Sequence, residues 1–530
     1  MNSENSHRLT LLLEKGDQNL LKSGLKGLEK ESLRINPKGL IAQTPHPVNL
    51  GAALTHPHIT TDYSEALLEF ITPPFADIKS TLQFLDDIHR YVYDHIGNEL
   101  LWSSSMPCGI NGDASIPIAE YGHSNVGQMK HIYRKGLSYR YGRTMQSIAG
   151  VHFNYSVPEA LWPVLMALEK KQGGLQDYIS ESYFGLIRNF LRQGWLILYL
   201  FGASPAICKS FFKSRPHLIE RFDRFDDYTL YHPYATSLRM SDIGYQSENQ
   251  ANLDVNYNSL SGYVSSLCQA ITTPYPEYQK MGIVVEDEYR QLNSNILQIE
   301  NEFYSVIRPK QIAKSCEKPT HALQERGVKY IEIRSLDLDL FDPNGIDESR
   351  ARFLEAFALT CLFQDSPPNQ PEDRKYNNQN QLAVANQGRK PNLMLQQGKN
   401  QITLKQWGQQ ILETMQPICA ILDQDNAQKP YSQSLEQQKK LLDNPDLTPS
   451  AKILQGMSNH QQPFSPYAMA ISKQHQALFK NKPVNADLET KFKVFAEQSF
   501  IKQKNIERND SDSFPEFLDC YFSQKQALNC

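Results

Sequence analysis

The chain contains 530 residues, of which 40% are hydrophobic and 21% charged, and its formal net charge is −4. This composition is that of a globular protein with a large core, and the balanced charge argues against nucleic acid or a membrane surface as a partner. The amino terminus has no cleavable apolar core, and the longest apolar run, near residues 195–207, is too short to span a bilayer. We therefore expect a cytoplasmic protein.

The eight cysteines are scattered along the chain and show no CxxC or zinc-type spacing. This pattern gives no support to a structural zinc site. Reduced thiols are the usual state in the cytoplasm, so we expect free cysteines, although the sequence leaves a single disulfide open.

The first predicted strand carries a pair of acidic residues. Leucines at helical spacing predict an opening helix over residues 7–26, and residues 27–37, GLEKESLRINP, follow as a strand that an Asn-Pro turn ends. Glu29 and Glu31 share one face of this strand, where two like charges destabilise a sheet unless something positive lies between them. A bound cation and a solvated edge strand explain this pair equally well.

The next strand contains an isolated carboxylate. A turn carrying Asp62 leads into the apolar strand of residues 66–72, in which Glu69 is the only charged residue. Because a carboxylate in apolar surroundings is costly unless it is paired or liganded, Glu69 favours a metal site. Glu65 fits a solvated position just as well.

A helix, a polar segment and a third strand follow. Residues 77–100 predict an amphipathic helix, and residues 121–146 form a polar, aromatic segment that suits a pocket for a small zwitterion or an ordinary helix surface. In residues 150–157, apolar side chains alternate with His152, Asn154 and Ser156. A lone histidine on a strand is usually structural, but its place on a polar face makes His152 a candidate ligand.

Two further predicted strands carry charge on one face. After helices over residues 176–200 and 256–272, separated by a polar loop at 234–245, residues 297–309 predict a strand with Glu300 and Glu302 on its polar face. Residues 328–337 predict another strand, in which isoleucines face one side and Glu332 and Arg334 the other. A carboxylate can hold a divalent cation and a guanidinium suits phosphate oxygens, although an isolated pair of this kind is usually an exposed ion pair.

The chain changes character after a helix predicted over residues 347–364. Residues 365–402 are crowded with Asn, Gln and Pro, which predicts a surface loop or disordered connector, and helical patterning returns over residues 404–425 and 434–480. We therefore divide the chain into a catalytic core of residues 1–364, a connector of residues 365–402, and a mainly helical region of residues 403–530 packed on the core.

The acidic and imidazole groups lie opposite apolar strand faces. This pattern predicts an α+β fold with an antiparallel curved sheet, whose concave face is wet and whose other face is backed and flanked by helices. Converging carboxylates repel unless divalent cations lie among them, and hard oxygen ligands favour Mg²⁺, with Mn²⁺ tolerated beside a histidine. The sequence shows no GxxxxGK[ST], HExxH or GxSxG motif and no GxGxxG after a strand. A bound nucleotide would therefore rely on metals and on Arg334 to hold its phosphates.

Beyond these patterns, the chain resembles the proteobacterial-type glutamate–cysteine ligases (γ-glutamylcysteine synthetases), a family of glutamine-synthetase-like carboxylate–amine ligases. The resemblance runs from about residue 24 to about residue 364. Its motifs, in order, are GLEKESLR, LTHPHITTDYSEALLEFITP, YRKGL…RYG, GVHFN, YLFGASPAIC, YATSLRMSDIGY, LQIENEFYSVIRPK and YIEIRSLD. Past residue 365 it thins to fragments such as DNPDLTPSAKIL.

The resemblance implies the glutamine-synthetase-like fold, an ATP-dependent ligation and a monomer. The γ-carboxylate of L-glutamate would attack the γ-phosphate of ATP, and the amine of L-cysteine would displace phosphate from γ-glutamyl phosphate, the first step of glutathione biosynthesis. Arg334 would stabilise the transferring phosphoryl group. The metal ligands implied for Mg²⁺ are Glu29, Glu31, Asp62, Glu69, His152 and Glu332. The substrate-binding residues implied are Tyr63, Tyr133, Arg134, Leu137, Gln146, Asn154, Arg239, Tyr245 and Tyr304.

One position departs from the family pattern, and alternatives to this function stay open. Tyr63 stands where many family members have Phe, which bears on how strictly a thiol is distinguished from a methyl or hydroxymethyl group. Glu300 and Glu302 are candidates for a supporting layer behind the metal ligands. The alternatives are a ligase for another amine, a metal-dependent hydrolase and, least favoured, a binding module without catalysis.

Overall fold

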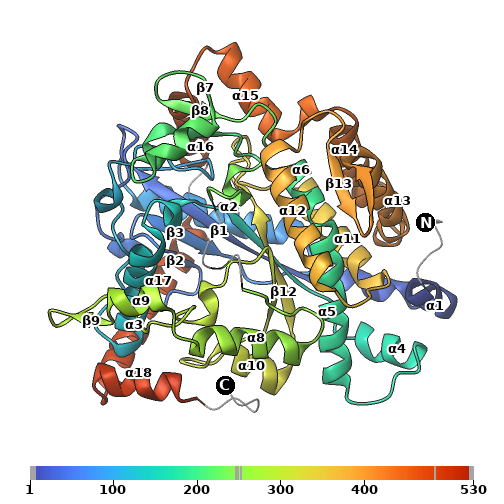
Figure 1. Cartoon of the computed structure of the whole chain (residues 1–530), viewed down its shortest axis with the longest axis horizontal. Coiled ribbons are helices and arrows are strands. Elements are labelled where there is room, and N and C mark those ends of the chain that lie inside the picture. Colours follow the sequence, from blue (N-terminus) through green and yellow to red (C-terminus); the bar gives the residue numbers. More distant parts are fainter. Residues whose placement is uncertain (1–6, 245–249, 251–252, 483–484, 525–530) are drawn as a thin grey trace.

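A computed structural model describes residues 7–244, 250, 253–482 and 485–524 of the chain (Figure 1). Its centre is a seven-stranded antiparallel sheet with strand order β11–β12–β5–β1–β3–β2, in which β4 pairs with β1. The strands are β1 (Leu25–Ile35), β2 (Ile59–Thr61), β3 (Leu67–Ile71), β4 (Leu100–Leu101), β5 (Val151–Ser156), β11 (Ile307–Lys310) and β12 (Tyr330–Leu336). The α+β fold with an antiparallel sheet, predicted from strand alternation, is confirmed.

One face of the sheet is apolar and is covered by helices. Leu28, Phe70 and Phe153 lie on this face of three neighbouring strands and are fully buried. Among the helices that contact the sheet are α2 (Ile78–His95), α5 (Leu175–Gln193), α6 (Trp195–Phe201) and α11 (Glu348–Phe363). A buried ion pair of 2.8 Å between Lys26 Nζ and Glu355 Oε1 ties β1 to α11. The apolar face therefore fixes the sheet and leaves its polar face for chemistry.

Further helices and small sheets surround this centre. The other helices before residue 330, among the described residues, are α1 (His7–Lys15), α3 (Asn125–Tyr141), α4 (Leu161–Leu168), α8 (Leu260–Thr272), α9 (Pro276–Met281) and α10 (Pro319–Arg326). The small sheets are β6 (Ala206–Cys208) with β8 (Thr229–Tyr231) and β7 (Asp223–Arg224), and the hairpin of β9 (Val284–Val285) and β10 (Glu288–Tyr289). The opening helix is shorter than predicted, because α1 ends at Lys15 and a 3₁₀ turn, Gln18–Ser23, leads into β1.

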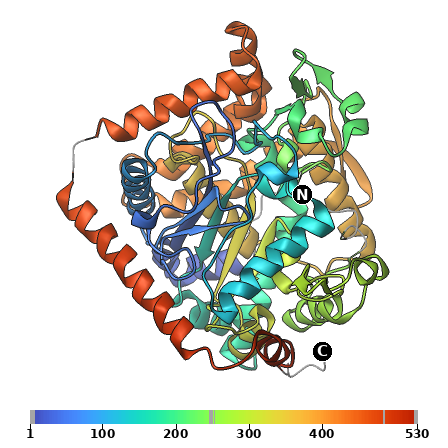
Figure 2. The ribbon, with the colours of Figure 1, turned by 90° about the vertical axis from the view of Figure 1, so that its left-hand side faces the viewer.

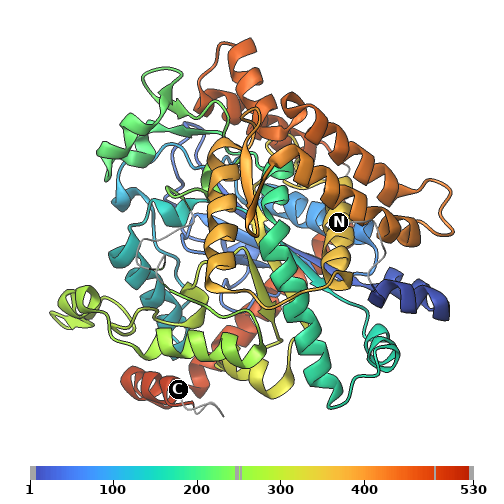
Figure 3. The ribbon, with the colours of Figure 1, turned by 45° about the vertical axis from the view of Figure 1, so that its right-hand side comes forward.

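The irregular connector predicted for residues 365–402 is wrong, because this segment forms regular structure. It folds into α12 (Pro371–Gln387) and a hairpin of β13 (Met394–Gln397) and β14 (Asn400–Thr403). Pro371 starts the helix, and Gln370 and Asp373 form a capping box. Val384 and Ala385 are buried, and α12 packs on α6 (Figure 3). Because most residues of this helix are polar and only a few apolar ones are buried, its composition resembles that of a disordered segment.

The strand predicted for residues 297–309 is confined to its last part, β11. Glu300–Glu302 instead form a 3₁₀ turn whose two carboxylates are buried. Glu302 Oε1 lies 2.9 Å from Arg140 Nη1, and Glu300 accepts a hydrogen bond from Thr320. Alternating polar residues here mark buried partners rather than a wet strand face, and the supporting role expected for the two glutamates stays a prediction.

The C-terminal helices wrap around the core. They are α13 (Leu404–Leu422), α14 (Pro430–Asp443), α15 (Pro449–Asn459), α16 (Phe464–Lys480), α17 (Ala486–Asn509) and α18 (Phe514–Phe522). Figure 2 shows α17 running along one side of the molecule, with α18 at the bottom of the view. Helix α17 packs on α2, and α18 packs on α3. These two helices, the C-terminal strap (residues 486–522), therefore link the helices behind the sheet to α3.

Two further features are the state of the cysteines and the length and polarity of the helices. A disulfide joins Cys108, which follows β4, to Cys208 at the end of β6, so the expectation of reduced thiols is wrong for this pair. Cys361 and Cys419 are buried free thiols. Among the helices of the described residues, none is long and apolar enough to cross a membrane.

Candidate active site

The strand register gathers the predicted metal ligands on one face of the sheet. Glu29 on β1 is opposite His152 on β5, and Glu31 is opposite Glu69 on β3. On the other side of β5, Glu332 is opposite Asn154. Because directly opposed residues of an antiparallel pair share a face, these side chains converge. The period-two pattern therefore placed each strand residue on the correct side.

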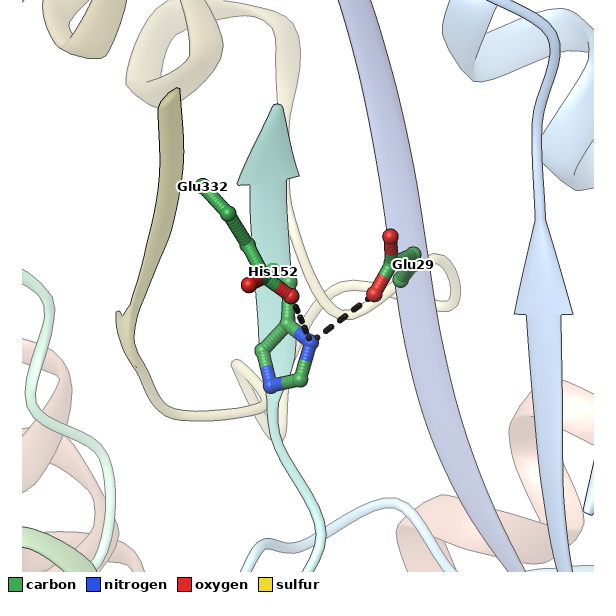
Figure 4. A group of neighbouring side chains, drawn as sticks. All are labelled: Glu29, His152 and Glu332. Atoms are coloured by element: carbon green, nitrogen blue, oxygen red, sulfur yellow. Dashed lines mark hydrogen bonds and ion pairs between the residues drawn. The ribbon is translucent and has the colours of Figure 1, made fainter. Parts of the chain in front are cut away.

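The centre of this face is a cluster of Glu29, His152 and Glu332, drawn in Figure 4. One potential ligand atom from each residue lies within 4.8 Å of the others. His152 Nδ1 is 3.1 Å from Glu29 Oε2 and 3.4 Å from Glu332 Oε1, and its Nε2 is 3.8 Å from Glu31 Oε1. Two carboxylates around an imidazole suit a divalent cation that accepts oxygen and nitrogen ligands.

Two cations hold the carboxylate of Glu332. Arg334 Nη1 lies 2.8 Å from Glu332 Oε1, and Lys310 Nζ lies 3.3 Å from Glu332 Oε2. Burial alone would raise the pKa of Glu332, but Arg334, Lys310 and His152 outweigh it and hold that pKa well below its ordinary value. Glu332 is therefore ionised at neutral pH.

Glu31 and Glu69 lie beside this cluster, and their pKa values are raised, whereas that of Glu332 is lowered. Burial, together with the charges of Glu29, Asp62 and Glu31, raises the pKa of Glu69 to about 8. Burial and Asp62 also raise the pKa of Glu31, whose Oε2 accepts a 2.6 Å hydrogen bond from the Gly150 amide. These carboxylates repel one another, and a cation between them would remove that cost.

Helix α3 supplies one wall of the site. It carries three of the residues assigned to amine binding, Tyr133, Arg134 and Leu137. The Arg134 guanidinium donates to the Asp62 carbonyl and lies 4.6 Å from the centre of the Tyr121 ring. The wall is therefore attached directly to the turn that carries Asp62, and Tyr63 is buried at that turn.

Two more of the candidate substrate-binding residues, Gln146 and Asn154, form hydrogen bonds near this wall. Gln146 Nε2 donates to the Tyr304 hydroxyl at 2.6 Å, and Asn154 Nδ2 donates to Glu29 Oε1 at 2.9 Å. Asn154 thus contacts a metal-ligand candidate directly. Tyr245 lies outside the described residues.

Arg239 is fully buried beneath the end of β12. Its Nη2 donates to the Arg334 carbonyl at 2.9 Å, and its Nη1 lies 4.0 Å from Asp337 Oδ1. A Cβ at Gly150 would come within 2.3 Å of Arg239 Nη2, so only glycine leaves room for the guanidinium there. Asp337 also accepts hydrogen bonds from Ser204 and Ser237. Sequence reasoning missed both Gly150 and Asp337, whose roles depend on contacts distant in the chain.

Lys310 is the other residue that the sequence interpretation missed. It ends the motif VIRPK and pairs in register with Tyr330, two residues from Glu332 on the same face of β12. The alternation of β11 would have indicated it, had the strand been predicted over the right residues.

A cavity of about 590 Å³ adjoins this site at the start of β11. Tyr304 and Val306 line one side, and α12 lines the other with Arg374, Asn377 and Gln381. The segment predicted as a disordered connector therefore forms a wall next to the candidate site.

Comparison with known proteins gives consistent matches over most of the chain. Residues 9–384 match the family model described as glutamate-cysteine ligase. Glutamate–cysteine ligases from Alcanivorax borkumensis and Saccharophagus degradans are 50% identical over 503 residues and 48% identical over 505 residues. These alignments cover 94% and 95% of this chain, and 95% of each relative.

Solved structures agree with this result. The glutamate–cysteine ligase of Francisella tularensis in complex with AMP has a TM-score of 0.88 and 36% sequence identity, and the match covers 94% of this chain and 97% of that one. A bifunctional glutathione synthetase from Pasteurella multocida, at 24% identity and a TM-score of 0.66, shares the fold. With the family model matched over most of its length and relatives about half identical end to end, the chain belongs to the glutamate–cysteine ligase family.

Proposed function

We propose that this protein joins the γ-carboxylate of L-glutamate to the amine of L-cysteine, with ATP as the energy source. The products are γ-L-glutamyl-L-cysteine, ADP and phosphate, and the reaction is the first step of glutathione biosynthesis. The observation that carries the proposal is the group of Glu29, His152 and Glu332, with Arg334 2.8 Å from Glu332, on the polar face of the sheet. The AMP bound by the Francisella relative supports a nucleotide as substrate.

The donor set fits a hard divalent cation. His152 Nε2 is buried and forms no hydrogen bond with any described residue, and the carboxylates around it repel one another. When bound, Mg²⁺, or Mn²⁺ in its place, neutralises phosphate oxygens and aligns the attacking carboxylate. The residues that would hold the metal are Glu29, Glu31, Asp62, Glu69, His152 and Glu332.

The reaction proceeds in two displacements. An oxygen of the glutamate γ-carboxylate attacks the γ-phosphorus of ATP, and the bond from that phosphorus to the ADP oxygen breaks. The cysteine amine then attacks the carbonyl carbon of γ-glutamyl phosphate, phosphate leaves, and the nitrogen loses a proton. Arg334 stabilises the negative charge of the transferring group, because its planar fork is fixed on one side by Glu332.

The amine substrate binds between α3 and the start of β11. Tyr133, Arg134 and Leu137 come from α3, and the hydrogen-bonded pair of Gln146 and Tyr304 closes the other side. Arg239 and Tyr63 complete the cysteine pocket, and Asn154 helps to hold substrate beside Glu29. A cytoplasmic location and a monomeric state remain predictions from the sequence.

The test is ADP release by purified protein with Mg²⁺, ATP and glutamate, with cysteine, 2-aminobutyrate, glycine or no amine added. We expect rapid release with cysteine, slower release with 2-aminobutyrate, and little with glycine. Turnover with another amine but not with cysteine would indicate a different ligase. Product release without ATP consumption would indicate the hydrolase instead.

A further inference from the structure

We propose that Lys310 binds the phosphate chain of the nucleotide at the end opposite Arg334, so that the two cations grip the triphosphate along β12. This inference rests on the proposed function. Lys310 ends β11 across from Tyr330, whereas Arg334 lies two residues beyond Glu332 in the other direction along β12. The two cations therefore approach the Glu332 carboxylate from opposite ends, one at each oxygen.

Lys310 differs from Arg334 in how firmly it is held. The Lys310 side chain is 31% exposed, against 11% for Arg334 and 1% for Glu332, and the ion pair with Glu332 is its one such contact within the described residues. A long, flexible side chain with one contact of 3.3 Å can exchange partners at small cost. The Lys310 ammonium thus contacts the buried cluster while its side chain remains partly exposed to solvent.

A cation bound by Glu29, His152 and Glu332 would change the electrostatics around this lysine. The Glu332 carboxylate would pair with the metal instead of with Lys310. The metal and the Lys310 ammonium, two positive groups within a few ångströms, would then repel unless anionic oxygens lie between them. The phosphate oxygens of a bound nucleotide would be those anions. Lys310 would therefore leave Glu332 and pair with phosphate when the metal–nucleotide complex binds.

Two neighbouring basic residues already have other partners. Arg308 donates through Nη2 to the carbonyls of Asn301 and Phe303, so its guanidinium supports the turn before β11. Lys329 lies next to Lys310 across the strand pair and donates its amide to the Lys310 carbonyl, but its side chain pairs with Glu159. Lys329, which carries the same charge, lies just before β12 and has a side chain that is 42% exposed, is therefore a nearby control.

The experiment measures ligand binding without turnover. The dissociation constants of ADP and of a non-hydrolysable ATP analogue, each with Mn²⁺, and of Mn²⁺ alone, are measured by calorimetry for wild type, Lys310→Gln, Lys310→Arg and Lys329→Gln. We expect Lys310→Gln to weaken both nucleotides by about tenfold or more, as the loss of a charge-assisted hydrogen bond predicts. Mn²⁺ alone should bind as tightly as in wild type or more tightly, because Glu332 loses a competing cation.

The pattern of outcomes separates the possibilities. Lys310→Arg should keep much of the nucleotide affinity, and Lys329→Gln all of it. Unchanged nucleotide binding in Lys310→Gln overturns the inference, as does a parallel loss of Mn²⁺ binding, which would make the lysine a support for Glu332 only. Wild-type protein that binds neither nucleotide overturns the proposed function itself, and with it this inference.

Discussion

Replacing Glu69 by Gln should stabilise the metal-free protein at alkaline pH. The folded pKa of Glu69 is about 8, against an ordinary value of 4.5, because of burial and the charges of Glu29, Asp62 and Glu31. A raised pKa in an acid means that the folded state favours the protonated form, so its contribution is complete below pH 4.5 and is lost as the pH rises through about 8. The glutamine never ionises, so the variant avoids this loss.

The size of the effect follows from the shift. Taken alone, the difference between the two pKa values corresponds to at most about 5 kcal/mol above pH 8. Because neighbouring carboxylates share the repulsion, we expect about 2 kcal/mol in favour of Glu69→Gln at pH 9, and almost no difference at pH 5. Urea denaturation with a chelator present, at pH 5, 7 and 9, measures this difference between variant and wild type.

A matched control lies in the same segment. Glu65 is buried and accepts hydrogen bonds from the amides of His46 and Glu120, so Glu65→Gln should destabilise the protein at every pH. Added Mg²⁺ should then stabilise wild type more than Glu69→Gln. Our reasoning is refuted if Glu69→Gln shows the same stability difference at pH 5 and pH 9, or if its response to Mg²⁺ equals that of wild type.

Three further predictions concern catalysis. Arg334→Lys should lower kcat about a hundredfold or more, because a point charge cannot replace the planar fork; near-normal kcat would argue against the phosphate role. Tyr63→Phe should change the ratio of kcat/KM for cysteine to that for serine by roughly fivefold, through loss of a buried hydroxyl, and an unchanged ratio would place Tyr63 outside the pocket. Ending the chain after residue 512 removes α18, which packs on α3, so the KM for cysteine should rise several-fold while binding of the ATP analogue stays unchanged; equal loss of both would show general unfolding.

The strands of the site could be predicted because they follow one local rule. In β5 and β12, imidazole or acidic residues alternate with apolar ones, and the buried apolar face fixes which way each strand turns. In β1, Glu29 and Glu31 share one face, while Leu28 and Lys30 lie on the other. Glu29, His152 and Glu332 meet because their strands are neighbours in the sheet, and the family resemblance made that adjacency an expectation. Only the local pattern, not the order of the strands, can be read from spacing.

The missed features depend on contacts between distant segments. Glu302 is paired with Arg140, which is 162 positions away, so its place in an alternating stretch gave a false strand. Helix α12 is held by a few buried residues such as Val384, and its Asn and Gln content resembles that of a disordered segment. A disulfide joins Cys108 and Cys208, which no spacing rule connects.

The protonation states of the site residues cannot be inferred from residue type alone. Glu332 and Glu69 are both glutamates on the same sheet face, yet the pKa of Glu332 is well below its ordinary value and that of Glu69 is about 8. The difference arises because Arg334 and Lys310 flank one carboxylate, whereas other carboxylates surround the second.

Burial and the charge of Arg334 would lower the pKa of His152, but hydrogen bonds to Glu29 and Glu332 outweigh them and raise that pKa to about 9. A cation can therefore bind at the Glu332 carboxylate without displacing a proton from it, whereas binding at His152 or at Glu69 at neutral pH must release one. Metal affinity on the Glu69 side should thus rise with pH up to about 8. Affinity at the group of Glu29, His152 and Glu332 should rise with pH up to about 9, and there the two cations that hold the Glu332 carboxylate also compete with the metal.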